Sequence, residues 1–227
     1  MTTFALITEG ITDQIVIETI LHSHYSDVLN EGEEVEVRAL QPLRDATDEA
    51  RQDENTFGGW ERVLEHCTLS DNISEAAAFN DFIIIQIDTD CAEHKNFGIP
   101  LTANGTEKAV NELIEDVKNL IISKIGHQVY STHEDKFIFA VAIHSTECWL
   151  LPLYAKTKAH ATRTKSCENH LKHFIKISGE DFRKDYDCYR KIAMPLKKKK
   201  MLVDVMEKNE SLNIFIASLP ELAGADE

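Results

Sequence analysis

DFIIIQIDTD, residues 81–90, is the strongest strand pattern in the chain. Its interior is a run of large apolar residues that only Gln86 interrupts. A strand that is apolar on both sides is buried on both faces, so the run predicts a central strand of a parallel sheet that is covered by helices. The segment then ends in two carboxylates, Asp88 and Asp90.

Further strand and helix patterns lie on both sides of this segment. Strand patterns cover residues 3–8, 33–40 and 137–143, and a polar loop covers 41–57. We expect Thr12 to cap a first helix and Ser74 to cap a short helical segment. Further helical patterns cover 58–67, 106–124 and the chain from about 165 onward. Strands that alternate with helices predict an α/β fold with a mainly parallel central sheet flanked by helices. We expect a core over residues 1–155 and a basic helical C-terminal elaboration over 156–227, packed on that core.

The composition is that of a globular protein. The chain has 227 residues, of which 43% are hydrophobic and 28% charged, which is enough for one sizeable core. No apolar run approaches the roughly 20 residues that cross a bilayer. The N-terminus, MTTFALITEG, has no basic leader, so we expect a cytoplasmic protein without membrane contact.

The cysteine pattern predicts reduced thiols. Cys67, Cys91, Cys148, Cys167 and Cys188 are odd in number, widely spaced and form no CxxC pair. This spacing is not typical of a disulfide framework or of a cysteine zinc site. The acidic residues beside Cys91 are expected to raise the pKa of its thiol and to disfavour a thiolate nucleophile.

The charge of the chain is unevenly distributed. Its net charge of −15 would by itself repel nucleic acid. Residues 151–200, however, contain fourteen Lys and Arg against five acidic residues, a local charge of +9, so the rest of the chain carries −24. This asymmetry indicates an acidic body with a basic surface in its C-terminal third, which either binds a polyanion or is only a solvated helical surface.

Acidic residues follow three of the predicted strands. Glu9 ends the first, Asp88 and Asp90 end the central one, Glu147 follows the third, and Asp13 lies in the first turn of the helix after Glu9. Because the carboxyl ends of parallel strands meet at one edge of a sheet, we expect these side chains to converge. Carboxylates packed together stay ionised only beside a cation, and hard oxygen ligands select Mg²⁺ or Mn²⁺, so we expect one or two such ions.

Plainer explanations exist for parts of this pattern. An Asp-x-Asp pair is often only the start of a loop, and Asp13 could simply complement the helix dipole, a contribution of about 0.3–1 kcal/mol. Glu9 has no such explanation, because an acid at the tip of a buried strand costs desolvation energy unless it has a partner. Gly10 is expected to let the backbone turn sharply after Glu9.

The motifs also resemble a known family. TEGITD (residues 8–13), followed by a hydrophobic strand that ends in DTD (88–90), resembles the Toprim catalytic domain of topoisomerases, primases and OLD-family nucleases. The E-G-x-[ST]-D form looks more like the OLD nuclease branch. Further segments are similar to uncharacterised bacterial Toprim-like proteins, including the RloB-like and DUF4276-type families, several of which are associated with defence against phage. These segments are GGWERV (58–63), TECWLL (146–151), and YRKIAMPLKKKKMLV (189–203) followed by SLNIFIASL (211–219).

The resemblance implies a Toprim-like, Rossmannoid core and a metal-dependent nuclease that cleaves phosphodiester bonds in DNA or RNA. By this resemblance, the metal ligands are Glu9, Asp88 and Asp90, with Asp13 and Glu147 as further ligands. The catalytic cation is one of Lys197, Lys198, Lys199 and Lys200, and we assign it to Lys198. These four lysines are expected to bind nucleic acid together with Arg163 and Lys165. The chain contains no P-loop, so an ATPase of the OLD kind would have to be a separate partner protein. A homodimer is the commonest assembly for such a chain.

Two other functions remain open at this point. An Asp-x-Asp pair at a strand end also occurs in haloacid-dehalogenase-type phosphatases, although that family carries it on the first strand and the pair here lies near residue 90. The chain could instead be a non-catalytic regulatory module that binds metal and nucleic acid. Binding without turnover would identify that module, and a trapped aspartyl-phosphate on Asp88 would identify the phosphatase.

Overall fold

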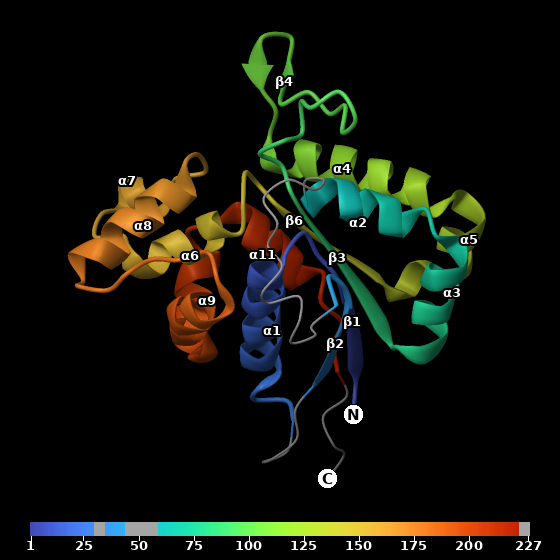
Figure 1. The fold of residues 1–227 in the computed structure, drawn as a ribbon, viewed down its shortest axis with the longest axis horizontal. Helices are drawn as coiled ribbons and strands as arrows, with labels where there is room; N and C mark the ends of the chain where they lie inside the picture. Colours follow the sequence, from blue (N-terminus) through green and yellow to red (C-terminus); the bar gives the residue numbers. More distant parts are fainter. Residues whose placement is uncertain (30–34, 44–58, 223–227) are drawn as a thin grey trace.

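A four-stranded parallel sheet forms the centre of the protein (Figure 1). The computed structural model describes residues 1–29, 35–43 and 59–222. The sheet has the order β2-β1-β3-β6, with β1 at Thr3–Ile7, β2 at Glu36–Gln41, β3 at Phe82–Asp88 and β6 at Phe137–Ala142, and all neighbours pair in parallel. The predicted α/β fold with a parallel sheet and helices on both faces is therefore confirmed, with DFIIIQIDTD forming an inner strand.

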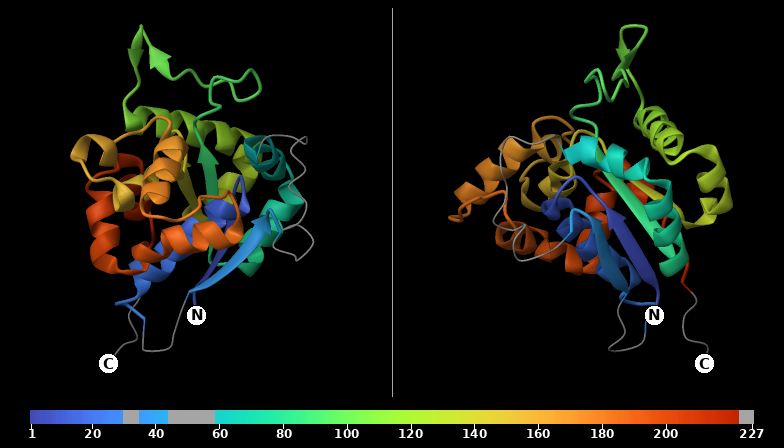
Figure 2. Two further views of the ribbon diagram at one scale, coloured as in Figure 1. Left: turned by 60° about the vertical axis from the view of Figure 1, so that its left-hand side comes forward. Right: turned by 45° about the vertical axis from the view of Figure 1, so that its right-hand side comes forward.

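Helices cover both faces of the sheet (Figure 2). One face carries α1 (Ile11–Tyr25), α6 (Glu147–Tyr154), α7 (Lys158–Ala161), α8 (Cys167–Ile177), α9 (Tyr186–Ala193), the 3₁₀ turn η3 (Met194–Lys197), α10 (Lys199–Met206) and α11 (Glu210–Ala217). The other face carries α2 (Gly59–Cys67), α3 (Ser70–Phe79), α4 (Val110–Ile125) and α5 (His127–Thr132), and the 3₁₀ turn η2 (Glu134–Lys136) leads into β6. Alternate residues of each strand face opposite layers, so that Leu6 and Ile84 contact the first group while Ile7 and Ile85 contact the second.

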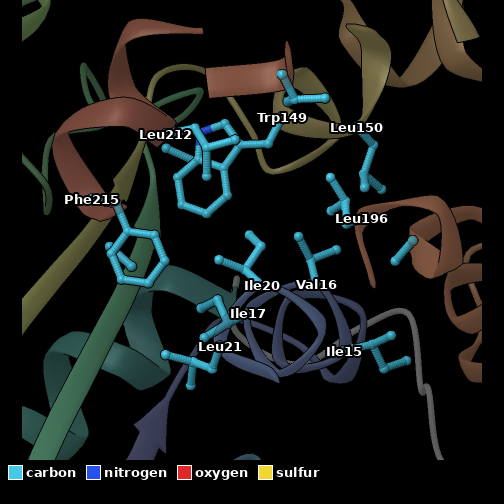
Figure 3. Close-up of a cluster of buried hydrophobic side chains, with 14 of the residues drawn as sticks. Ile15, Val16, Ile17, Ile20, Leu21, Trp149, Leu150, Leu196, Leu212 and Phe215 are labelled. Atoms are coloured by element: carbon cyan, nitrogen blue, oxygen red, sulfur yellow. The ribbon is translucent and has the colours of Figure 1, made fainter. Parts of the chain in front are cut away.

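The C-terminal helices share one apolar core with α1. Val16, Ile17 and Ile20 of α1 face Trp149 of α6 and Phe215 of α11 (Figure 3). The rings of Trp149 and Phe215 stack with centroids 5.6 Å apart. Because each buried side chain of this size contributes about 1.5–3 kcal/mol, the helices after residue 156 are held on the sheet by the same packing that holds α1.

Local details differ from the sequence predictions. Thr12 lies inside α1 rather than capping it, and Ser74 lies inside α3. The helix expected from residue 106 begins at Val110, because a small antiparallel hairpin, β4 (Thr102–Ala103) and β5 (Thr106–Glu107), precedes it. The turn of this hairpin is Asn104-Gly105, and both residues have a positive φ, as tight hairpin turns require. Most of the loop predicted over 41–57 lies outside the described residues.

The prediction of reduced cysteines is wrong for one pair. Cys148 and Cys167 form a disulfide with their Cα atoms 5.0 Å apart, whereas Cys67, Cys91 and Cys188 are free. The pairing arises because α6 and α8 pack against each other, which a separation of 19 positions did not reveal. Within the described part of the chain, no helix has the length and apolar character needed to cross a membrane.

Candidate active site

The predicted acidic residues converge at the carboxyl edge of the sheet. Glu9 follows β1, Asp88 and Asp90 lie at the end of β3, Asp13 is in the first turn of α1 and Glu147 begins α6. The charge of each of the other four carboxylates acts on Asp88. The structure therefore places these five residues at the same edge of the sheet.

Glu9 and Asp88 are linked directly and through Gln86. The backbone N–H of Asp88 donates a 2.7 Å hydrogen bond to Oε1 of Glu9. Gln86 accepts from the N–H of Glu9 at 3.0 Å and donates to Oδ1 of Asp88 at 2.7 Å. Gln86 is fully buried, so its amide fixes both acidic residues at the sheet edge. The sequence marked this role only by placing one polar residue inside an apolar strand.

Asp13 and Glu147 are buried and bonded to hydroxyl groups. The Thr146 hydroxyl donates to Oδ1 of Asp13, and the Tyr189 hydroxyl donates to Oε1 of Glu147. Tyr189 belongs to α9, so the C-terminal helices contribute to the site. Neither Thr146 nor Tyr189 was predicted from the sequence, because nothing in their local pattern distinguishes them from core residues.

Three of these carboxyl groups resist ionisation. Burial, followed by the charge of Asp13, raises the pKa of Glu9 to about 8. Burial and the charge of Glu147 raise the pKa of Asp13 to about 6. Burial and the charge of Glu9 hold the pKa of Asp88 well above its ordinary value. Burial first, and the neighbouring carboxylates second, thus oppose the charged form of these three groups.

Among the residues that the structure describes, Lys184 is the basic side chain that pairs with this edge. Its Nζ lies 3.4 Å from Oε1 of Glu147 and 3.3 Å from Oε2 of Glu168, and its side chain is about half exposed. Burial alone would raise the pKa of Glu147, but Lys184 and the Ser145 and Tyr189 hydroxyls outweigh it and lower that pKa. Burial opposes the charge of Lys184, but the surrounding carboxylates raise its pKa and keep it protonated.

Two glycines give the acidic residues room. The chain bends between β1 and α1, but Gly10 is extended, with φ −150° and ψ 169°, a conformation that any residue can adopt. A Cβ at Gly10 would lie 3.2 Å from Oδ2 of Asp13, so the requirement is space for that carboxylate. A Cβ at Gly59 would lie 2.7 Å from the carbonyl oxygen of Glu9, which places the start of α2 directly against the first motif.

The backbone of His144 holds the segment after β3. Its carbonyl accepts from the N–H groups of Thr89 at 3.1 Å and Asp90 at 3.0 Å, and its own N–H donates to Oγ1 of Thr89 at 2.7 Å. His144 has a φ of 70°, a conformation that is costly for a residue with a Cβ.

Burial and the charge of Asp90 raise the pKa of Cys91 to about 11, in agreement with the predicted absence of a thiolate nucleophile.

The predicted lysine run is not brought to the acidic residues. Lys199 pairs with Asp27, just beyond the C-terminal end of α1, and Lys197 lines a pocket of about 390 Å³ with Glu18 and His22 of α1. Asp13 lies at the opposite end of α1, a helix about 22 Å long. Lys198 lies between these two lysines in the sequence. We therefore assign the role of the site's cation to Lys184 instead of Lys198.

The remaining predicted nucleic-acid ligands lie elsewhere on the surface. Lys200 is an exposed residue of α10, in the same run as Lys199. Arg163 and Lys165 lie between α7 and α8, and Lys165 pairs with Glu107 of the small hairpin. Charge density along the sequence identified basic surface but not its position relative to the acidic residues.

The donor set suits a hard divalent ion, although a finished cage is absent. In residues 1–29, 35–43 and 59–222, no three His, Cys, Asp or Glu side chains stand in an arrangement that could hold an ion directly. Mg²⁺ commonly takes one or two carboxylates and keeps several waters. Glu9 and Asp88 lie at the ends of neighbouring strands, and burial, followed by nearby carboxylate charge, raises the pKa of each, so this pair fits such an ion.

Comparison with known proteins adds no relatives. No family model, curated protein or solved structure matches the chain. The function must therefore be argued from the residues at the carboxyl edge of the sheet.

Proposed function

We propose that this protein is a metal-dependent nuclease of the Toprim type that cleaves phosphodiester bonds in DNA or RNA with Mg²⁺ or Mn²⁺. The observation that carries the proposal is the convergence of Glu9, Asp13, Asp88 and Glu147 on one edge of a parallel sheet, where their mutual repulsion calls for a cation. The resemblance of TEGITD and DTD to the Toprim motifs gives that edge a chemistry.

The residues divide into groups that hold an ion and groups that orient them. Glu9 and Asp88 would hold the ion, with Asp90 beside them, and Gln86 keeps the pair in register. Asp13 and Glu147 carry added negative charge whose orientation is set by Thr146 and Tyr189. When bound, a divalent ion stabilises charge that develops on phosphate oxygens and acidifies water.

Lys184 would meet the substrate. Its ammonium group is protonated, half exposed and beside the acidic cluster, so a phosphate oxygen approaching the edge can accept a hydrogen bond from it. Such a contact also lets an edge of net negative charge accept a polyanion. Stabilisation of this kind acts on charge that develops in the transition state.

Three further properties are part of the proposal. The absence of a P-loop and the resemblance to OLD nucleases favour a separate ATPase partner and a role in defence against phage. A homodimer is the simplest assembly. A cytoplasmic location is part of the same proposal.

Cleavage assays on near-isosteric variants test the function. Purified full-length protein with Mg²⁺ or Mn²⁺ should cleave one of a set of labelled substrates: single-stranded or duplex DNA, single-stranded or duplex RNA, and transfer RNA. Glu9→Gln and Asp88→Asn should abolish cleavage, whereas Asp71→Asn on α3, on the other face of the sheet, should not. Cleavage that persists in excess EDTA, or in Asp88→Asn, would overturn the proposal. Binding without cleavage would favour the regulatory module instead.

A further inference from the structure

The outer surface of α7 and α8 is basic in an acidic protein. Residues 156–177 contain six Lys and Arg against one acid, Glu168, in a chain of net charge −15. The six are Lys156, Lys158, Arg163, Lys165, Lys172 and Lys176. All are exposed, and in the described part of the chain only Lys165 has a carboxylate partner, Glu107. Five cations on and beside these two helices are therefore available to phosphate groups.

A cluster of rings lies among these cations. His160 of α7 stacks on His170 of α8 with centroids 5.9 Å apart and lies 5.4 Å from the ring of Phe174. His173 lies 5.7 Å from the same ring. We call His160, His170, His173 and Phe174 the ring cluster. His173 is exposed, whereas His160, His170 and Phe174 are half-buried, and Phe174 also packs against the core that Leu171 and Ile175 enter.

Glu168 connects the start of α8 to the acidic site. Glu168, in the first turn of α8, binds the Lys184 that also contacts Glu147. The Cys148–Cys167 disulfide fixes the start of α8 beside α6. His170 follows Glu168 by two positions, within the 5.4 Å pitch of one turn. The N-terminal end of α8 is therefore the end of that helix nearer to the acidic site.

We propose that the ring cluster stacks unpaired bases while the surrounding Lys and Arg side chains hold the backbone, so that the ligand of this surface is single-stranded nucleic acid. Aromatic side chains in a positively charged surface are the combination by which proteins bind single strands of any sequence. In a duplex the faces of the bases are already stacked on one another, so the rings have no partner. That this strand is also the substrate rests on the proposed nuclease function.

Two observations accord with stacking. Burial, followed by the charges of Arg163, His160 and His173, lowers the pKa of His170, which disfavours a charged ring there. The five cations without a carboxylate partner among the described residues supply the attraction for phosphate. Rings and charges thus have separate tasks on this surface.

Fluorescence anisotropy of the full chain in EDTA tests binding without cleavage. The probes are labelled oligo-dT and oligo-rU of about 16 nucleotides, the upper end of single-strand site sizes, and a duplex of the same length. We expect at least one single strand to bind about tenfold more tightly than the duplex, and the two strands to distinguish DNA from RNA. His170→Ala and His173→Ala should each weaken single-strand binding about tenfold without weakening duplex binding. Lys172→Ala and Lys176→Ala should each reduce the salt dependence of single-strand binding by about 0.7 in log–log slope.

His127→Ala, an exposed histidine of α5 on the other layer, is the matched control and should bind like the wild type. Thermal melting establishes that each variant is folded, and His173, being exposed, is the variant least able to disturb packing. Equal affinity for duplex and single strands, or wild-type affinity in both histidine variants, would overturn the proposal. Failure of the nuclease function is a different result: wild-type protein with metal would leave the strand uncut while still binding it.

Discussion

The backbone N–H of Asp88 donates a 2.7 Å hydrogen bond to the carboxylate of Glu9, although 79 positions separate the two residues in the sequence. This contact joins the ends of two neighbouring strands of the sheet, β1 and β3. It places both acidic motifs at one point before any ligand is considered. The carboxyl edge is thus an organised site rather than a chance gathering of surface acids.

Gln86 should be essential to this organisation. Gln86→Met keeps the size of the side chain but leaves the N–H of Glu9 and a carboxylate oxygen of Asp88 without their partner. Loss of these buried hydrogen bonds should lower the free energy of unfolding by about 1–3 kcal/mol in urea denaturation. Calorimetric titration should also show weaker Mn²⁺ binding. Gln128→Met, at an exposed position of α5, should change neither measurement; equal behaviour of the two variants would contradict this role.

Metal-free protein should lose stability as pH rises. Glu9 has a pKa raised from 4.5 to about 8, so the folded state holds a proton that the unfolded state releases. The stabilisation is complete below pH 4.5 and is lost as pH rises through about 8. By the linkage relation it should amount to roughly a few kcal/mol. Unfolding in EDTA should show this fall, and Mg²⁺ should reverse it at pH 8. Glu9→Gln should flatten the profile; a variant profile that superposes on the wild type would show that Glu9 does not titrate in this range.

Gly59 should tolerate no side chain. A Cβ there would lie 2.7 Å from the carbonyl oxygen of Glu9 and 2.9 Å from its Cβ. Gly59→Ala must therefore shift α2 or Glu9, at a cost of about 1–3 kcal/mol. We expect lower thermal stability together with lower cleavage activity. Gly105→Ala in the hairpin meets no atom within 4 Å and should lose only backbone stability, with activity kept.

The disulfide should stabilise the junction of α6 and α8. Cys148 and Cys167 are separated by 19 positions, and closing a loop of this size contributes about 3 kcal/mol through the unfolded state. Cys167→Ser should lose this amount in oxidising buffer and should then be insensitive to dithiothreitol. The wild type should fall to the same stability when reduced, and Cys91→Ser, which removes a free thiol, should respond like the wild type. A wild type that dithiothreitol leaves unchanged would show that the bond is absent in solution.

The sequence predicted the parts of the site that local patterns encode. Strand ends are visible because burial on both faces requires an apolar run, and the residue after such a run lies at the sheet edge; Glu9 and Asp88 followed from this rule. Gly10 was identified but for the wrong reason, since space for Asp13 and not backbone conformation requires it. Gln86 was visible as a polar residue in β3, but its two partners lie on separate strands and could not be assigned.

The cation of the site was not predictable in this way. Lys184 lies in the segment between α8 and α9, and its position depends on how those helices pack on α1 and α6. Lys197–Lys200 attracted attention because four adjacent lysines are conspicuous, yet the same packing carries them toward the far end of α1. Tyr189 likewise reaches Glu147 only through the tertiary fold.

Lys184 and Lys198 can be separated by one substitution each. The charge of Lys184 contacts Glu147 and lowers the pKa values of Asp13 and Glu147. Lys184→Met removes this charge, so both pKa values should rise. Loss of one such charge at a reacting phosphate should reduce the cleavage rate about 10²–10³-fold. Lys198→Met removes an equal charge from the exposed run after η3 and should leave the rate near that of the wild type.

The size of the rate loss distinguishes chemistry from general attraction. A cation that only attracts the polyanion changes the apparent affinity and its salt dependence, whereas one at the reacting phosphate lowers the rate at saturating substrate. We therefore expect Lys184→Met to lower kcat in single-turnover assays with excess enzyme. If Lys198→Met instead showed the larger loss at saturation, the lysine run would have to fold over the acidic residues in the complex, and Lys184 would be only the structural partner of Glu147 and Glu168.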